Sequence, residues 1–507
     1  MTGYRVCPPP YTVPALVLIA WALLLAAWVM GNPLFAAPDE ADHFIRAVGV
    51  SEGHLIGIAD PTARIGATPI LIRWTSQEAR IVSLPRDLDP VPFTCELAPG
   101  VRDAACLNIA RPTPTAMTRV TAVGNYQPLP YLLPAVALRA GRSAPSALRL
   151  GRAAEGLTAL GLLAIAVFAL YDSGSPLISL LGLLLAVTPM VLFCAAILNG
   201  SATEITGAIA FFSCLLRMGR RGPTRARWWA LAALSGSILA LSRSPSPAWL
   251  AVALLVAVGW SEPRAFVRSW KSNWALRVTA GVLLLAVIVN RIWEALYGTH
   301  VSLDTTKLHA GLVAGVHEWW RALPELVGRF GYLDVELPLV IPLVWLALVL
   351  TLVVAGSAVS GRRERLVLAA MGLAGLGGPV IFYTLIIRPT GGGLQGRHVL
   401  PVLVLVPLFA GEALNRHRER VRAAWRSLLT TTIPLAVAVI QVDAWYVNVR
   451  HYAVGGAGPM WFLGRAAWAP PAGWWTWLGA TVLAGVGLAA VSLGGRETTS
   501  ALGTDHL

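Results

Sequence analysis

Long uninterrupted runs of apolar residues limit what this chain can fold into more than any other feature. About 20 apolar residues let an α-helix cross the hydrocarbon core of a bilayer. Only 13% of the 507 residues are charged, and 56% are hydrophobic, whereas soluble domains carry about 25% charged residues. The sequence therefore predicts an all-α, polytopic membrane protein, with residues 1–507 forming a single domain of about twelve transmembrane helices. The predicted spans lie near 11–30, 148–171, 176–197, 203–217, 228–242, 247–260, 276–297, 337–357, 366–387, 398–414, 427–446 and 474–494.

Short basic loops predict the orientation of these spans. Every second connection is rich in arginine, and the positive-inside rule places such loops in the cytoplasm. The long segment 31–147 then becomes the first extracytoplasmic loop of a multi-pass plasma-membrane protein. Residues 126–141 are half apolar. A full span there would invert every later loop, so we expect an interfacial helix on the outer surface instead. The net charge of +14 is dispersed over the loops, which argues against a nucleic-acid partner. The basic loops cover 217–227, 264–271, 362–365 and 416–426.

A cluster of acidic residues follows the first span directly. Asp39, Glu40, Asp42 and His43 come after Pro38, which favours the first turn of a helix. The helix dipole stabilises carboxylates in that turn. The pattern fits a catalytic cluster and a solvated helix start equally well.

Further polar residues fall at the outer ends of other spans. Charged side chains at this depth are costly unless they are paired or face a wet cavity, so their common level indicates one outward-facing site. Arginines suit phosphate, which they bind bidentately. Ser201 and Glu204 also have the spacing of a helix capping box. No His/Cys ligand spacing indicates a metal, although a divalent cation is an alternative to arginine for neutralising phosphate. The residues are Arg152, Glu204, Arg243, Asp334, Arg388, Arg397 and His398.

Two of the five cysteines, Cys95 and Cys106, lie in the predicted outer loop. Disulfides persist in such an oxidising compartment, so the sequence predicts a Cys95–Cys106 disulfide. Cys194 and Cys214 lie within spans and are interpreted as small apolar residues.

Three motifs resemble a bacterial family of predicted membrane proteins, domain of unknown function family 2142. They are Pro38-Asp39-Glu40-x-x-His43-Phe44, Tyr126-Gln127-Pro128-Leu129-Pro130-Tyr131 and Gln395-Gly396-Arg397-His398-x-x-Pro401. The resemblance runs from residue 31 to about 471. The chain departs from the family at His398, where Tyr is expected, and at Asn199-Gly200-Ser201, where a turn of Asn-Pro-Asn/Asp type is expected.

The family in turn resembles the GT-C membrane glycosyltransferases, which use polyprenyl-phosphate sugars as donors. The resemblance implies a GT-C-like fold and inverting transfer of a sugar to a cell-envelope glycan on the extracytoplasmic face. An arabinofuranosyl group is one candidate sugar. The donor already carries a good leaving group, so one carboxylate acting as a base is sufficient. The implied roles are Asp39 as base, Glu40 as the second choice and His43 orienting the carboxylate; Arg397, Arg388, Arg152 and Arg243 binding the donor phosphate; and Tyr126, Tyr131, Glu204, Asp334 and His398 contacting substrate.

Two other functions compete with this one. A transporter or flippase of polyprenyl-linked lipid or polysaccharide favours internal repeats and helices interrupted near the midplane, and the sequence indicates neither. A proton-coupled carrier also favours an acid in mid-span. A non-catalytic envelope-assembly protein does not need acids and arginines at one depth. The sequence names neither the sugar nor the acceptor.

Overall fold

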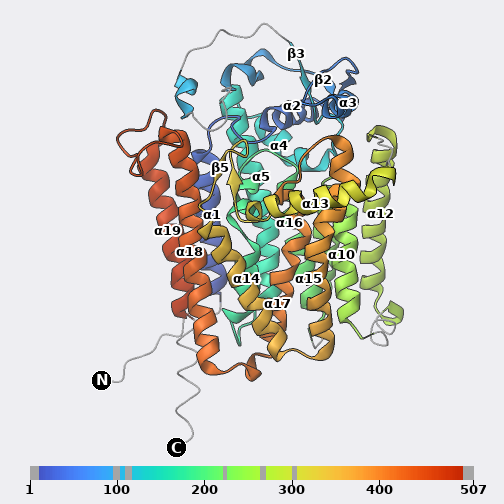
Figure 1. Ribbon diagram of the computed structural model, residues 1–507, viewed down its shortest axis with the longest axis vertical. Coiled ribbons are helices and arrows are strands. Elements are labelled where there is room, and N and C mark those ends of the chain that lie inside the picture. Colours follow the sequence, from blue (N-terminus) through green and yellow to red (C-terminus); the bar gives the residue numbers. More distant parts are fainter. Residues whose placement is uncertain are drawn as a thin grey trace, which may run out of the picture.

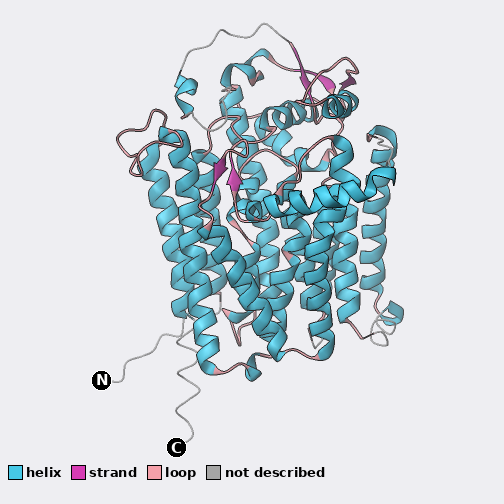
Figure 2. Ribbon diagram, viewed as in Figure 1, coloured by secondary structure: helices cyan, strands magenta, loops and turns pink. Residues whose placement is uncertain are grey.

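The computed structural model describes residues 11–94, 103–108, 117–220, 225–262, 270–299 and 305–494. Its long helices run side by side as a bundle, and a cap of short helices and strands covers one end (Figures 1 and 2). Each of the predicted apolar runs coincides with one helix or with two consecutive helices. These helices are α1 (Thr12–Gly31), α5 (Ala144–Leu170), α6 (Leu181–Ala186), α7 (Pro189–Ala195), α8 (Ser201–Met218), α9 (Ala226–Ala240), α10 (Ser246–Trp260), α12 (Trp274–Tyr297), α14 (Val340–Val359), α15 (Arg362–Phe382), α16 (Gly396–Leu403), α17 (Leu405–Arg416), α18 (Ala423–Val454) and α19 (Gly473–Gly494).

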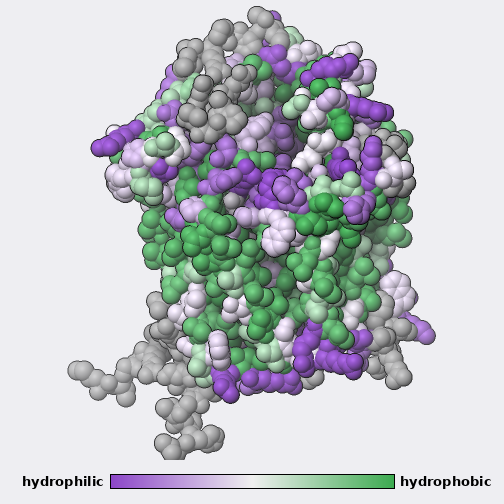
Figure 3. Space-filling view, viewed as in Figure 1, coloured by the Kyte–Doolittle hydropathy of each residue, from purple (hydrophilic) through white to green (hydrophobic). Residues whose placement is uncertain are grey.

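The all-α membrane architecture is confirmed, but the count of twelve spans is not. Among the described residues, eight helices are long and apolar enough to cross a membrane, or nine if a bent pair forms one span. α9 and α10 have only 15 residues each, about 22 Å of helix. The hydrocarbon core is about 30 Å thick. Apolar side chains form a broad belt around the visible face of the bundle, with polar residues above and below it (Figure 3).

The third predicted span is broken, which the sequence analysis did not anticipate. α6 and α7 meet at 63°, because Pro189 begins α7 and cannot donate to the preceding turn. Backbone groups freed at such a break need other partners inside a bilayer. Gln441 donates to the Val187 carbonyl at 2.8 Å, and the Met190 amide donates to Val327 at 2.8 Å. The break is therefore enclosed by the protein and satisfied.

The cap is built from segment 31–147. It contains α2 (Glu40–Ser51), α3 (Pro69–Glu78) and α4 (Leu129–Leu138), together with an antiparallel sheet of order β1-β2-β3. The strands are β1 (Ile58–Ala59), β2 (Arg80–Ser83) and β3 (Thr118–Thr121). α4 has ten residues, about 15 Å, so it is too short to cross a bilayer. The prediction that 126–141 holds a non-spanning helix is confirmed.

A second outer segment packs against the cap end of the bundle. α13 (Leu308–Ala322) runs across the bundle helices, and the hairpin of β4 (Arg329–Phe330) and β5 (Val335–Glu336) follows it (Figure 1). Phe330 anchors the hairpin, because its ring centroid lies 4.9 Å from that of Trp28 and 5.2 Å from that of Phe193. The hairpin turn therefore has a fixed place above α1 and α7.

Two of the four arginine-rich connections are fully described, and they lie at the other end of the bundle. The α14–α15 and α17–α18 connections are both opposite the cap (Figure 1), and polar residues form a rim there (Figure 3). Part of this charge is paired within the protein: Arg220 binds Glu412 at 2.6 Å. The basic loops 217–227 and 264–271 lie partly outside the described residues, so the alternation over the whole chain stays a prediction.

Candidate active site

Asp39 is the exposed carboxylate of the acidic cluster. Its side chain is 53% exposed, while Ala37 and Glu40 on either side are 2% and 0% exposed. Asp39 stands directly before α2 with φ of +58° and does not cap the helix through its side chain. The left-handed conformation is unfavourable for most residues but is tolerated by Asp and Asn. The backbone turn therefore holds this carboxylate out of the protein.

Arg397 lies beside Asp39. Its Nη2 is 3.7 Å from Asp39 Oδ2, and its side chain is only 7% exposed. Its Nε donates to Gln395 at 2.7 Å. The start of α16 is held in place because the Gly396 amide donates to Glu325 at 2.9 Å. Arg397 is therefore a fixed cation next to an accessible carboxylate.

Glu40 is buried in a bidentate pair with Arg152. Arg152 Nε and Nη2 donate to the two carboxylate oxygens at 2.7 and 2.5 Å. The three other guanidinium contacts go to the backbone carbonyls of Val29, Asn32 and Pro33. All five N–H donors of Arg152 are thus used, and none remains for a phosphate. The geometry contradicts the predicted phosphate-binding role of Arg152 and places the Glu40 carboxylate in a buried ion pair.

His43 is a buried, neutral histidine. Its Nδ1 is 2.7 Å from the Tyr131 hydroxyl, and its ring stacks on Tyr131 with centroids 5.9 Å apart. Burial lowers the pKa of His43 most, and together with the positive charges of Arg397 and Arg243 it brings this pKa to about 3. His43 packs against the ring of Tyr126, at 6.1 Å, rather than binding the Asp39 carboxylate.

His43→Gln is expected to make the protein less sensitive to acid. The unfolded histidine has a pKa near 6.5 and the folded one about 3, so the unfolded chain binds the extra proton as the pH falls through this window. Stability therefore declines on acidification, by about 2 kcal/mol at pH 5. Gln cannot take up the proton. Melting temperatures at pH 7.5 and pH 5 measure the effect, with the exposed His54→Gln as control. An equal acid-induced loss in wild type and His43→Gln would contradict this account.

Arg243 provides a second cation near His43 and Tyr126. It lies in the turn between α9 and α10, with Nη1 3.4 Å from Ser201 Oγ and 3.8 Å from Glu204 Oε2. Glu204 is fully buried and accepts hydrogen bonds from Ser246 at 2.7 Å and from Trp249 at 3.0 Å. Its carboxylate therefore holds Arg243 in place. The first amides of α8, those of Ser201 and Ala202, donate to Asn199 Oδ1 at 2.6 and 3.2 Å instead, so the capping-box interpretation of Glu204 is wrong.

Four side chains from distant segments come together around Tyr126: Asp39, Arg397 and Arg243 act on it electrostatically, and His43 packs against its ring. Arg397 and Arg243 both act electrostatically on His43 and Tyr126, and Arg243 also contacts Tyr126. One guanidinium next to an exposed carboxylate, with a second within electrostatic range of the same Tyr126, favours an anionic ligand that also brings a proton to be removed.

The structure does not bring every predicted residue to this site. Arg388 donates to the Lys307 carbonyl at 2.9 Å, near α13. Asp334 pairs with His451 at 3.5 Å. His398 accepts from the Gln395 amide at 3.3 Å as part of the α16 cap. Unlike Arg388 and Asp334 it does lie near the site, because Arg243 and Arg397 both act on it electrostatically. Cys106 is disulfide-bonded, but Cys95 lies outside the described residues, so the predicted pairing stays a prediction.

Three residues near the site were not assigned a role from the sequence. The Tyr332 hydroxyl lies against the Asp39 backbone amide, because the hairpin turn brings it there. Asp42 accepts from the Ala122 amide at 2.7 Å, and burial raises the pKa of Asp42 to about 6. Glu155 is 1% exposed on α5. The sequence did contain a signal for Glu155, because an acid one helical turn beyond Arg152 is unusual within an apolar run. No feature of the local sequence indicates that Tyr332 lies near Asp39.

The part of the chain that the structure describes contains no group of three or more His, Cys, Asp or Glu side chains placed to hold a metal ion. The cationic groups at the site are the two arginines.

Comparison with known proteins identifies the family. The model of the family described as "Predicted membrane protein (DUF2142)" matches residues 22–406, which include all three motifs. The chain belongs to this family. A search of curated proteins finds no match. Among solved structures, this DUF2142 protein is similar to "Crystal Structure of ArnT from Cupriavidus metallidurans in the apo state", with 13% identity and a TM-score of 0.40 over 96% of this chain and 77% of that chain.

Proposed function

We propose that this protein is a membrane glycosyltransferase that moves a sugar from a polyprenyl-phosphate donor to a cell-envelope glycan on the extracytoplasmic face. One observation carries the proposal. The exposed Asp39 carboxylate stands 3.7 Å from the fixed guanidinium of Arg397, and Arg243 acts electrostatically on the same buried His43 as Arg397 does. This arrangement supplies a base and an anion site at the end of an apolar bundle that a lipid-linked donor can reach.

The proposed reaction is a single displacement. Asp39 accepts the proton of the acceptor hydroxyl, whose oxygen attacks the anomeric carbon. The bond between that carbon and the phosphate oxygen breaks, and its electrons leave with the polyprenyl phosphate. Arg397 and Arg243 stabilise the charge that builds on the phosphate. Attack opposite the leaving group inverts the anomeric centre. An arabinofuranosyl group is one candidate sugar, and hexoses are others.

A transfer assay on purified protein tests this function. Radiolabelled polyprenyl-phosphate arabinofuranose and polyprenyl-phosphate hexoses are each incubated with the protein and an envelope glycan. Transfer of label to the glycan from one donor is the expected result. Retention of all label on every lipid would reject the enzyme and favour a non-catalytic assembly protein.

A transporter is the second candidate, and two observations favour it. The broken span α6–α7 is an interruption of the kind that transporters use at binding sites. Glu155 lies within α5, close to the Thr203 amide, yet neither of its carboxylate oxygens forms a hydrogen bond of ordinary geometry within the described residues. Buried acids of this kind act in proton-coupled carriers.

Glu155→Gln separates the two candidates. Gln keeps the shape of the side chain but cannot carry a proton. A transferase is expected to keep its turnover within about tenfold of wild type, a change of about 1.4 kcal/mol in the barrier. A proton-coupled carrier is expected to lose proton-dependent movement of polyprenyl-linked lipid across proteoliposomes. Measuring both activities on wild type and Glu155→Gln decides the matter, and loss of coupled transport would favour the carrier.

A further inference from the structure

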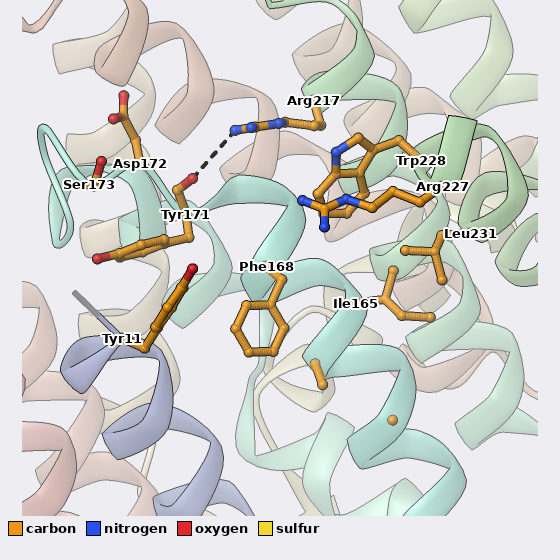
Figure 4. A pocket seen from close by; sticks show the side chains of 12 residues that line it. Tyr11, Ile165, Phe168, Tyr171, Asp172, Ser173, Arg217, Arg227, Trp228 and Leu231 are labelled. Atoms are coloured by element: carbon orange, nitrogen blue, oxygen red, sulfur yellow. Dashed lines mark hydrogen bonds between the residues drawn. The ribbon is translucent and has the colours of Figure 1, made fainter. Parts of the chain in front are cut away.

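A cavity of about 770 Å³ lies at the end of the bundle opposite the cap, between α1, α5, α8 and α9 (Figure 4). It is remote from the candidate active site: Arg152 and Phe168 stand sixteen residues apart on α5, about 24 Å along the helix. The proposed transferase reaction does not use it. Its lining includes Tyr11, Gly161, Phe168, Arg217, Arg227 and Trp228.

Two arginines and an indole form the polar side of this cavity. The guanidinium carbons of Arg217 and Arg227 lie 5.7 and 5.0 Å from the centre of the Trp228 ring. Within the described residues, neither arginine forms an ion pair with a carboxylate. The nearby Asp172 is instead held by Arg418 at 3.1 Å. Asp172 also lines the cavity, and it acts on Arg217 electrostatically together with Glu412. Both arginines nevertheless lack a direct ion pair, among the described residues, where the bundle meets its polar rim.

The other side of the cavity is apolar and belongs to the lateral surface of the bundle. Phe168 is 44% exposed, and Ile165 and Leu231 line the same wall (Figure 4). A Cβ added at Gly161 would meet no atom within 4 Å, so an open slot continues along α5. A hydrocarbon chain can cover this apolar wall and remove it from water. A water-soluble anion would contact only the arginines and would leave the apolar wall uncovered.

We propose that this cavity binds a membrane phospholipid with an anionic headgroup. The phosphate lies between Arg217 and Arg227, and one acyl chain follows the slot at Gly161 along α5. Arginine binds phosphate oxygens through several N–H groups at once. Basic pockets between helices, at the level of the headgroups, are suited to anionic lipids. The inference rests on this cavity alone and does not depend on the proposed function.

Photocrosslinking of the full chain in nanodiscs tests the site. A trace of phosphatidylglycerol or of phosphatidylcholine, each with a diazirine on the acyl chain, is activated, and the labelled peptides are mapped by mass spectrometry. Phosphatidylglycerol is expected to label the α5 and α9 segments roughly tenfold more than phosphatidylcholine does, as two arginines near an anionic headgroup allow. Equal labelling by the two lipids would overturn the proposal.

Variants decide which groups are responsible. Arg217→Gln/Arg227→Gln is expected to reduce labelling by phosphatidylglycerol to the level of phosphatidylcholine. Gly161→Phe, which fills the slot and keeps both arginines, is expected to reduce it as well. The matched control is Arg362→Gln/Arg363→Gln, two exposed arginines on α15 outside the cavity lining, and it should label as wild type. Loss of labelling in this control, or displacement of the lipid by inorganic phosphate alone, would contradict a lipid site built by Arg217 and Arg227.

Discussion

Asp39→Asn is expected to lower turnover by about 100- to 10,000-fold, the usual contribution of a general base. Asn has nearly the same shape and tolerates the left-handed φ of +58° found at this position, so the turn before α2 should survive. What disappears is the proton acceptor. Donor binding should change little, because Arg397 and Arg243 would hold the phosphate and the bundle would hold the lipid tail.

Single-turnover transfer and donor-binding measurements on the same preparation check this expectation. The exposed Asp87→Asn, on the same cap, is the matched control, because it removes one carboxylate from the surface without touching the site. Full transferase activity in a folded Asp39→Asn protein would remove Asp39 from the mechanism. If Asp39 only lies at a solvated helix start, Asp39→Asn should lower the local stability by a few tenths to about 1 kcal/mol and leave turnover unchanged.

Glu40→Gln is expected to destabilise the protein by about 3–5 kcal/mol, because it leaves the guanidinium of Arg152 buried without its counter-charge. Both side chains are almost completely buried, at 0% and 1% exposed. The pair also joins the start of the cap to α5, since Arg152 binds three carbonyls at the end of α1 and just after it. Thermal unfolding in detergent measures the loss.

A double variant separates a structural role of Glu40 from a catalytic one. Glu40→Leu/Arg152→Met replaces both charges with apolar groups of similar volume, and such replacements often recover stability. We expect it to melt above Glu40→Gln. A Glu40→Gln protein that is as stable as wild type but inactive would move the base from Asp39 to Glu40.

The sequence was sufficient for the location of the helices, because each span needs its own apolar run whatever its neighbours are. It did not predict the break between α6 and α7. Pro189 was visible, but a proline alone does not say whether Gln441 lies close enough to satisfy the carbonyl that a break exposes. The number of spans predicted from the sequence also differs from the number of membrane-length helices among the described residues. α9 and α10 are apolar but short, and the length of a run in the sequence does not measure how deep it sits.

The sequence located the acidic cluster but could not assign separate roles to its carboxylates. Asp39 and Glu40 are adjacent, lie in one motif and carry the same charge, so the local sequence could not show which of the two carboxylates is exposed. Their separation comes from burial: α5 carries Arg152 to Glu40, whereas the hairpin and α16 bring Tyr332 and Arg397 to Asp39. The same reasoning removes Arg152 from the list of phosphate ligands, whereas the roles of Arg397 and Arg243 stay predictions.

The amino-acid sequence by itself determined the class of protein, the order of its helices and the segment that carries the acidic cluster, because hydrophobicity and turn chemistry act over a few neighbouring residues. Only the tertiary structure decided which carboxylate is accessible, which arginines are already paired and where a cavity lined by arginines without a direct ion pair lies. These properties depend on contacts between residues more than a hundred positions apart, such as Glu40 with Arg152 and Asp39 with Arg397, and no local pattern records them.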